Sequence, residues 1–236
     1  MTKEVSSFFN NFATEYDKAA FKQSLGTQYL SEIETNFVLK NLRTANKSKI
    51  LEIGIGTGRF AQLLGSRTTY YGIDISCKMM EGVKKKLKIR QVNLILADGG
   101  KTLPLRNNRL DGVICIRVLK YIPTWKQTIK ETSRVLQKNG IFICEVANSS
   151  SVAHLGLKNA KYRLLNPDKV IEILRNTGFK INKIEPSVRL PFPLYTRIKN
   201  PKILNFFKKV ERTLNILLPK KTLSRNILIA STKGVS

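Results

Sequence analysis

A glycine-rich turn is the segment of this sequence whose residues are best suited to hold a ligand. Residues 50–60 run from an apolar strand-like stretch through Gly54, Gly56 and Gly58 into a helical pattern. Glycine lets a ligand approach the backbone without meeting a Cβ, and the N-terminus of the following helix favours a carboxylate or a phosphate. Arg59 stands where the dinucleotide fingerprint GxGxxG has its third glycine. This spacing argues against a nucleotide-binding oxidoreductase.

Three acidic residues accompany the turn, each at the end of a strand-like run. They are Glu52, before the glycines, Asp74, after the next run, and Asp98, after the third. A carboxylate at the second strand end can accept hydrogen bonds from both hydroxyls of a ribose, and one at the third can accept from an exocyclic adenine amine. Ligands of α/β proteins bind at the carboxyl edge of the sheet, so the three positions together predict a nucleoside-binding edge.

The elements that position these residues alternate between short β-branched runs and helical patterns. This alternation is typical of a doubly wound, Rossmann-like α/β fold with a parallel sheet covered by helices. The predicted strands are residues 49–53, 69–73, 93–97, 112–116, 141–146, 180–184 and 226–231.

Helices are predicted before, between and after these strands. Residues 1–45 are helical, and one apolar face is formed by Leu30, Ile33, Phe37 and Leu42. A helix from about 125 to 136 begins after Thr124 as its N-cap and is closed by Asn139-Gly140, and another runs from Asn166-Pro167 to Gly178.

A basic amphipathic segment precedes the last strand. Residues 180–236 carry 13 Lys and Arg against 2 Asp and Glu, and the whole chain has a net charge of +26. An apolar stripe at helical spacing consists of Ile203, Phe206, Phe207, Val210, Leu214 and Leu217. Two interpretations remain open, a helix at an anionic membrane surface and a lid packed over the substrate.

We therefore expect one domain over 1–236. It has an N-terminal helical cap (1–45), a cofactor-binding core (46–189), the basic insertion (190–225), and the last strand with a tail (226–236).

Composition narrows the class of protein and its compartment. The 236 residues are 42% hydrophobic and 25% charged, which excludes wholesale disorder. We expect no signal peptide, no transmembrane helix and no metal site, since Cys77, Cys115 and Cys144 lack CxxC spacing. The prediction is a cytoplasmic protein with buried free thiols, peripheral to the inner face of the membrane if the basic helix binds lipid.

From Phe8 to Glu145 the sequence resembles the class I S-adenosylmethionine-dependent methyltransferases, in particular their type 11-like subgroup. The motifs that carry the resemblance are, in chain order, ATEYD at 13–17, the glycine loop, DISCKMM at 74–80, Asp98, LPL at 103–105, LDGVI at 110–114, VLKYI at 118–122 and RVLQKNG at 134–140. The resemblance implies a seven-stranded sheet whose last strand is antiparallel, and S-adenosyl-L-methionine as the cofactor.

The resemblance also implies roles for individual residues. By the resemblance, the methionine part of the cofactor is bound by Glu52 and by the loop residues Gly54, Ile55, Gly56, Thr57 and Gly58. By the same resemblance, Asp74 binds the ribose, and Asp98 and Gly99 bind the adenine. Further contacts with the cofactor are expected from Tyr16, Ile75 and Ile116. Two positions depart from the family pattern, because Lys120 replaces a histidine common in the subgroup and Leu110 replaces an aromatic residue.

Methyl transfer from a sulfonium is an in-line displacement that needs alignment and exclusion of water more than a nucleophile. A base helps if the acceptor is a hydroxyl or an acidic carbon. The leading candidates are His154 and Glu145, and Tyr121 and Lys120 are the others. We predict methylation of a small lipophilic or lipid-linked acceptor at the cytoplasmic membrane surface. The alternatives are an RNA (tRNA or rRNA) methyltransferase and a methyltransferase-like binding protein without turnover.

Overall fold

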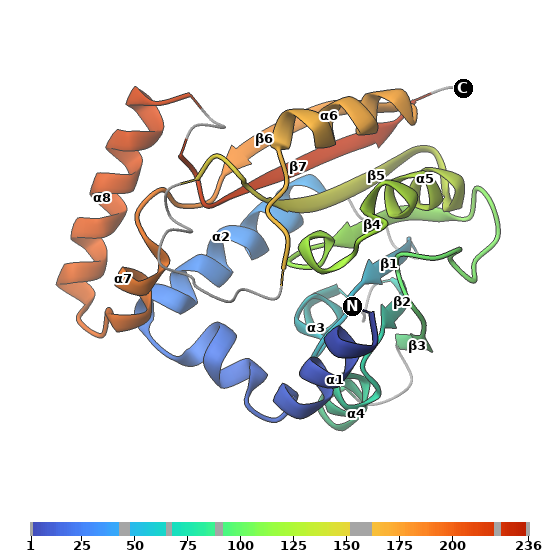
Figure 1. Ribbon diagram of the computed structural model, residues 1–236, viewed down its shortest axis with the longest axis horizontal. Coiled ribbons are helices and arrows are strands. Elements are labelled where there is room, and N and C mark those ends of the chain that lie inside the picture. Colours follow the sequence, from blue (N-terminus) through green and yellow to red (C-terminus); the bar gives the residue numbers. More distant parts are fainter. Residues whose placement is uncertain are drawn as a thin grey trace.

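Seven strands form one sheet in the order β3-β2-β1-β4-β5-β7-β6 (Figure 1). The computed structural model describes residues 2–42, 48–64, 68–87, 92–151, 162–219 and 223–234. The strands are β1 (Lys49–Ile53), β2 (Thr69–Asp74), β3 (Val92–Leu96), β4 (Leu110–Cys115), β5 (Leu136–Ala147), β6 (Phe179–Pro186) and β7 (Asn226–Lys233). Neighbouring strands from β3 to β5 are parallel, whereas β7 runs antiparallel to both β5 and β6. The predicted fold, with its antiparallel last strand, is confirmed.

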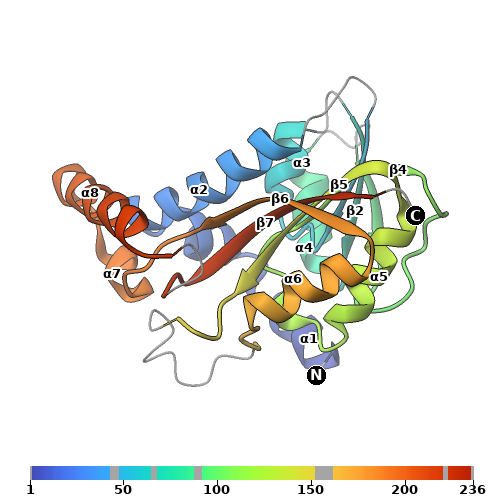
Figure 2. The same ribbon diagram turned by 90° about the horizontal axis from the view of Figure 1, so that it is seen from above.

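Helices cover both faces of the sheet (Figure 2). They are α1 (Thr2–Phe12), the π-helical turn η1 (Lys18–Lys22), α2 (Leu25–Asn41), α3 (Arg59–Leu64), α4 (Cys77–Lys86), the 3-10 turn η3 (Leu119–Tyr121), α5 (Trp125–Val135), α6 (Pro167–Asn176), α7 (Phe192–Arg197) and α8 (Pro201–Leu217). One apolar core lies between the sheet and α5 and α6, and a second lies between the sheet and α2, α3 and α4. Successive residues of a strand enter opposite cores, as Ile50 and Leu51 do.

Helix α2 carries the predicted N-terminal apolar face. Leu30, Phe37 and Leu42 are buried and Ile33 is half-buried. The helix begins at a capping box, because the Ser24 hydroxyl accepts the Thr27 N–H at 3.1 Å while the Thr27 hydroxyl accepts the Ser24 N–H at 3.0 Å.

The predicted end of α5 is wrong. The helix stops at Val135, and β5 begins at Leu136, which pairs with Leu110 of β4. Sheet pairing therefore ends the helix five residues before Gly140. Thr124 stands at the N-cap, but its hydroxyl donates to the Gly100 carbonyl at 2.7 Å instead of capping the helix.

The insertion between β6 and β7 packs on α2 through α7 and α8, at the outer end of the molecule (Figure 1). Glu211 fixes it from inside, since this buried carboxylate accepts the N–H groups of Arg189 and Leu190, each at 2.9 Å, and the Tyr195 hydroxyl at 2.5 Å. Asn200 caps α8 by accepting the Lys202 N–H at 2.8 Å.

The predicted apolar stripe of α8 divides into two halves. Phe207 packs against the buried Tyr195, with ring centroids 5.7 Å apart, and Val210 and Leu214 are half-buried. The other members, Ile203, Phe206 and Leu217, are exposed. The stripe is thus neither wholly core nor wholly surface.

Within the described residues, the helices are too short or too polar to span a bilayer. Cys115 and Cys144 are buried free thiols as predicted, but Cys77 is exposed at the start of α4, so that part of the prediction is wrong.

Candidate active site

A cavity lies at the carboxyl edge of the sheet, where the ends of β1, β2 and β4 meet α1 and the loop after β3. Its volume is about 740 Å³ when the space open to solvent is included. The sequence-predicted residues on its wall are Tyr16, Gly54, Gly56, Asp74, Ile75, Asp98, Gly99 and Ile116. The structure thus brings together eight of the twelve residues predicted to contact a cofactor.

The glycine loop turns sharply from β1 into this cavity. Gly54 and Gly56 have φ of 74° and 54°, values that side chains with a Cβ rarely adopt. The N–H groups of Gly54 and Ile55 both donate to the Ile73 carbonyl, at 2.7 and 3.0 Å, which ties the loop to β2. A Cβ at Gly54 would lie 2.2 Å from the Val118 side chain, whereas one at Gly56 would meet nothing within 4 Å. The loop is therefore packed at its base and open at its tip.

Asp74 is held at the cavity wall by the backbone. One of its carboxylate oxygens accepts the Gly56 N–H and the other accepts the Ser76 N–H, each at 2.8 Å. Burial raises the pKa of Asp74, while the bonds from Ser76 and Gly56 oppose that rise. Each oxygen keeps a lone pair for a further donor. Asp98 is similar, since it accepts the Gly100 N–H at 2.8 Å.

Four predicted residues are not on the cavity wall. Glu52 lies beneath it, where its carboxylate accepts the Tyr70 hydroxyl at 2.8 Å, and burial raises its pKa to about 8. Ile55 is buried in the core, and the Thr57 hydroxyl donates to Asp17. Gly58 begins the turn into α3 beside Val83. Because these residues support the loop from behind, direct cofactor contact by them stays a prediction.

Comparisons with known proteins place this geometry in a family. Residues 51–144 match the family model of the methyltransferase domain. An uncharacterised protein of Methanocaldococcus jannaschii is 32% identical over 180 residues, which are 73% of this chain and 80% of that protein. This chain belongs to the class I S-adenosylmethionine-dependent methyltransferases.

Two further similarities concern named enzymes. The methyltransferase is 26% identical to the demethylmenaquinone methyltransferase of Staphylococcus haemolyticus over 151 residues, 60% of each chain. Its fold is similar to that of geranyl diphosphate C-methyltransferase from Streptomyces coelicolor, with a TM-score of 0.73, 14% identity and 98% of each chain covered.

The cofactor of this methyltransferase is S-adenosyl-L-methionine, and the cavity suits such a molecule. The tip of the loop at Gly56 is open to a ligand, and the carboxylate of Asp74 is fixed with acceptor capacity to spare. Asp98 and Gly99 form the neighbouring part of the wall. The cofactor supplies an activated methyl group, and these residues are available to bind and orient it.

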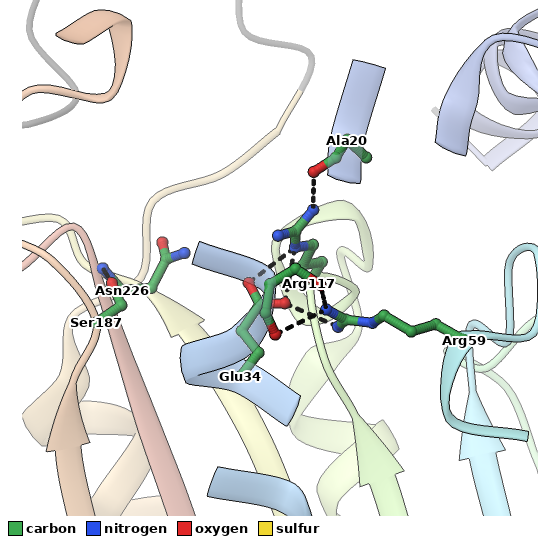
Figure 3. A network of polar contacts seen from close by, with 7 residues as sticks. Ala20, Glu34, Arg59, Arg117, Ser187 and Asn226 are labelled. Carbon is green, nitrogen blue, oxygen red and sulfur yellow. Dashed lines mark hydrogen bonds and ion pairs between the residues drawn. The ribbon is translucent and has the colours of Figure 1, made fainter. Parts of the chain in front are cut away.

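A buried ion cluster beside the cavity was not predicted from the sequence (Figure 3). Glu34 of α2 lies between two arginines, with 2.7 Å from its carboxylate to Nη2 of Arg59 and 2.8 Å to Nε of Arg117. Burial opposes ionisation of Glu34, but the two guanidinium charges hold its pKa below the ordinary value. Arg117 also lines the cavity and has φ of 63°, a strained conformation that the bonds to Glu34 stabilise. The cluster joins α2 to the start of α3 and to the loop after β4.

The two catalytic candidates differ in what can be said of them. Glu145 of β5 is buried, and neither of its carboxylate oxygens has a hydrogen-bond partner in the described part of the chain. His154 lies outside the described residues. Val5 and Phe9 of α1, which were not predicted, line the cavity, and so does Tyr121 of η3, one of the other candidate bases. The signal that could have identified Val5 and Phe9 is the apolar helical pattern at the N-terminus, which was interpreted only as a helical cap.

Proposed function

We propose that this methyltransferase methylates a lipophilic or lipid-linked acceptor at an anionic membrane surface, with the cofactor bound by the predicted residues on the cavity wall. The observation that carries the proposal is the exposed half of α8. Phe206 and Leu217 are 63% and 70% exposed, and Ile203 and Ile216 are exposed beside them. Large apolar side chains gathered on one face of a cationic helix favour an interfacial position in a membrane.

The basic residues of α8 are arranged to support that position. Lys202, Lys209 and Arg212 are exposed, whereas Lys208 is half-buried with its ammonium 4.8 Å from the centre of the Tyr29 ring. Each cation close to anionic headgroups contributes about 1 kcal/mol to binding.

Aromatic rings at the cavity support a lipophilic acceptor. Phe9 packs edge-to-face on Tyr121, with centroids 5.1 Å apart, and Tyr16 lies 6.2 Å from Phe9. All three line the cavity. Relatives named for demethylmenaquinone and geranyl diphosphate, both of which carry hydrocarbon chains, agree with an apolar acceptor. The lid interpretation is weaker, because α8 contributes no described residue to the cavity wall.

Labelled methyl transfer tests the acceptor class. Purified protein is incubated with S-adenosylmethionine carrying a labelled methyl group and, separately, with total lipid and total RNA from its source. Label in the lipid fraction supports the proposal, whereas label in RNA alone overturns it in favour of the RNA alternative.

Sedimentation with liposomes tests the surface. The protein is expected to bind vesicles containing anionic lipid at low salt and to bind neutral vesicles poorly. Lys202→Glu with Lys209→Glu should weaken binding by roughly 30-fold or more, from about 1 kcal/mol for each lost cation. Lys84→Glu with Lys85→Glu makes the same charge change on the exposed face of α4 and should retain most of the binding.

Two phenylalanine variants separate membrane contact from packing. Phe206→Ala should lose liposome binding without a change in melting temperature, and Phe207→Ala should melt earlier because its ring is packed on Tyr195. A protein that ignores anionic vesicles at every salt concentration would show that α8 has no membrane role.

A further inference from the structure

Glu145 is the least satisfied polar group near the cavity. It lies opposite Leu228 in the β5–β7 ladder, its side chain is 2% exposed, and both carboxylate oxygens are without a hydrogen-bond partner among the described residues. Burying a carboxylate without donors costs several kcal/mol, so native proteins rarely keep one without a reason. Asn226, opposite Ala147 on the same face of the sheet, has an Oδ1 atom that is likewise unpartnered there (Figure 3). Both residues lie where β5 reaches its carboxyl end, the edge of the sheet at which the cavity is found.

Positive charge surrounds this carboxylate. Arg117 and Lys120 after β4, and Arg225 before β7, lie close enough for their charges to act on Glu145, as does Glu34 of α2. With Arg59, the described part of this buried charge cluster holds four cations and two carboxylates. The site therefore has a surplus of positive charge that favours a negative group and opposes a cationic one.

The charge cluster is continuous with the cofactor cavity. Arg117 and Tyr121 line the cavity, and Lys120 stands between them in the sequence. The ammonium of Lys120 lies 5.4 Å from the ring centre of Tyr121 and 4.9 Å from that of Tyr162. An acceptor with a flat ring can pack against Tyr121 on the cavity wall. Glu145 follows Cys144, which pairs with Cys115 of β4, so it lies level with Ile116 of that wall.

We propose that Glu145 accepts the hydroxyl proton of a weakly acidic acceptor, phenolic or enolic, while Lys120 and Arg117 stabilise the negative charge that develops on its oxygen. This deepens the proposed function and rests on it for the place of the acceptor. The oxygen forms a bond to the methyl carbon, the carbon–sulfur bond breaks with its electron pair left on sulfur, and the proton passes from the hydroxyl to Glu145. A primary amine, cationic at neutral pH, is disfavoured by the surplus of cations that the described residues place around Glu145.

The electrostatics of the two residues agree with these roles. Burial raises the pKa of Glu145, Glu34 raises it further, and Lys120, Arg117 and Arg225 oppose the rise. Burial lowers the pKa of Lys120 to about 8. A general base is most effective when its pKa is near the working pH, so the rise at Glu145 improves it as a proton acceptor at neutral pH.

The test uses p-nitrophenol, whose phenolate absorbs visible light, as a probe of the acceptor site. The protein is first saturated with S-adenosylhomocysteine, with binding measured by calorimetry, and bound nitrophenol is then titrated with pH. Lys120→Met removes a cation and should raise the apparent pKa of the bound phenol by about one pH unit. Glu145→Gln removes a negative charge and should lower it by a similar amount.

Opposite shifts in these two variants would support the proposal, because a merely structural role predicts neither. Lys126→Met is the matched control, since Lys126 lies over Trp125 at 5.9 Å and outside the cluster, and it should leave the titration unchanged. If Glu145→Gln does not fold, comparison of the wild-type and Lys120→Met titrations still tests the proposal. A protein that binds S-adenosylhomocysteine but not nitrophenol, or whose variants titrate alike, overturns this inference and leaves the proposed function intact. Failure to bind S-adenosylhomocysteine would count against the proposed function itself.

Discussion

Glu52 gives a quantitative prediction about stability and pH. In the folded protein burial raises its pKa to about 8, whereas the unfolded chain ionises it near its ordinary 4.5. Between these values the folded state holds a proton that the unfolded state has released, so stability falls as pH rises. Each pH unit corresponds to about 1.4 kcal/mol, which makes the loss about 4 kcal/mol between pH 5 and pH 8.

Glu52→Gln removes this titration while keeping an oxygen that can accept the Tyr70 hydroxyl. We expect the variant and the wild type to differ by less than about 1 kcal/mol at pH 5, and the variant to be more stable by about 4 kcal/mol at pH 8. Urea denaturation of the cofactor-free proteins, followed by circular dichroism at half-unit steps of pH, measures this difference.

Glu185→Gln is the matched control, because Glu185 lies on β6 with its side chain 45% exposed beside Lys183. Its difference from wild type should stay constant over the same pH range. A constant difference for Glu52→Gln as well would refute the reasoning, since it would mean that the folded protein keeps Glu52 ionised.

Three further predictions concern the site. Asp74→Ala should weaken S-adenosylhomocysteine binding by roughly 10- to 100-fold, from about 1.5–3 kcal/mol for charge-assisted bonds; unchanged affinity in calorimetry would end the ribose assignment. Asp98→Ala should weaken binding less and Asp98→Asn, which keeps an acceptor oxygen, less still, and equal losses would argue against the adenine role. Glu34→Gln leaves the buried Arg59 and Arg117 without their shared charge, so thermal unfolding should show a loss of about 3–5 kcal/mol; a loss below 1 kcal/mol would mean that solvent already screens the cluster.

The parts of the fold predicted well are those with strong local patterns. The seven strands are β-branched runs of the right length, and each is found within a few residues of its expected position. The end of α5 was missed because the helical pattern continues through Leu136, while pairing with Leu110 draws that residue into the sheet. Local periodicity does not show whether a residue is more stable in a further helical turn or paired with a strand that is distant in the sequence.

The candidate site likewise contains some residues that sequence spacing predicts and others that it does not. The glycine loop and the acidic strand ends follow from spacing, because parallel strands bring their carboxyl ends to one edge. Glu34 was missed because its partners Arg59 and Arg117 stand 25 and 83 positions away in the sequence. In α8, the spacing identifies an apolar face, but only the contact with Tyr195 of α7 decides that Phe207 is inside and Phe206 outside.

The narrow base of the insertion gives the fold a modular design. The two chain ends that enter and leave it are bonded side by side, with the Ser187 N–H donating to the Asn226 carbonyl at 2.9 Å and the Arg225 N–H donating to the Val188 carbonyl at 2.7 Å. Closing a loop twice as long costs only about 0.6 kcal/mol more. Replacement of residues 189–224 is therefore expected to leave the sheet and its carboxyl edge intact. The loss of stability would come mainly from the face of α2 that α7 and α8 cover. The insertion can therefore vary in sequence and length without rebuilding the edge of the sheet that carries the glycine loop, Asp74 and Asp98.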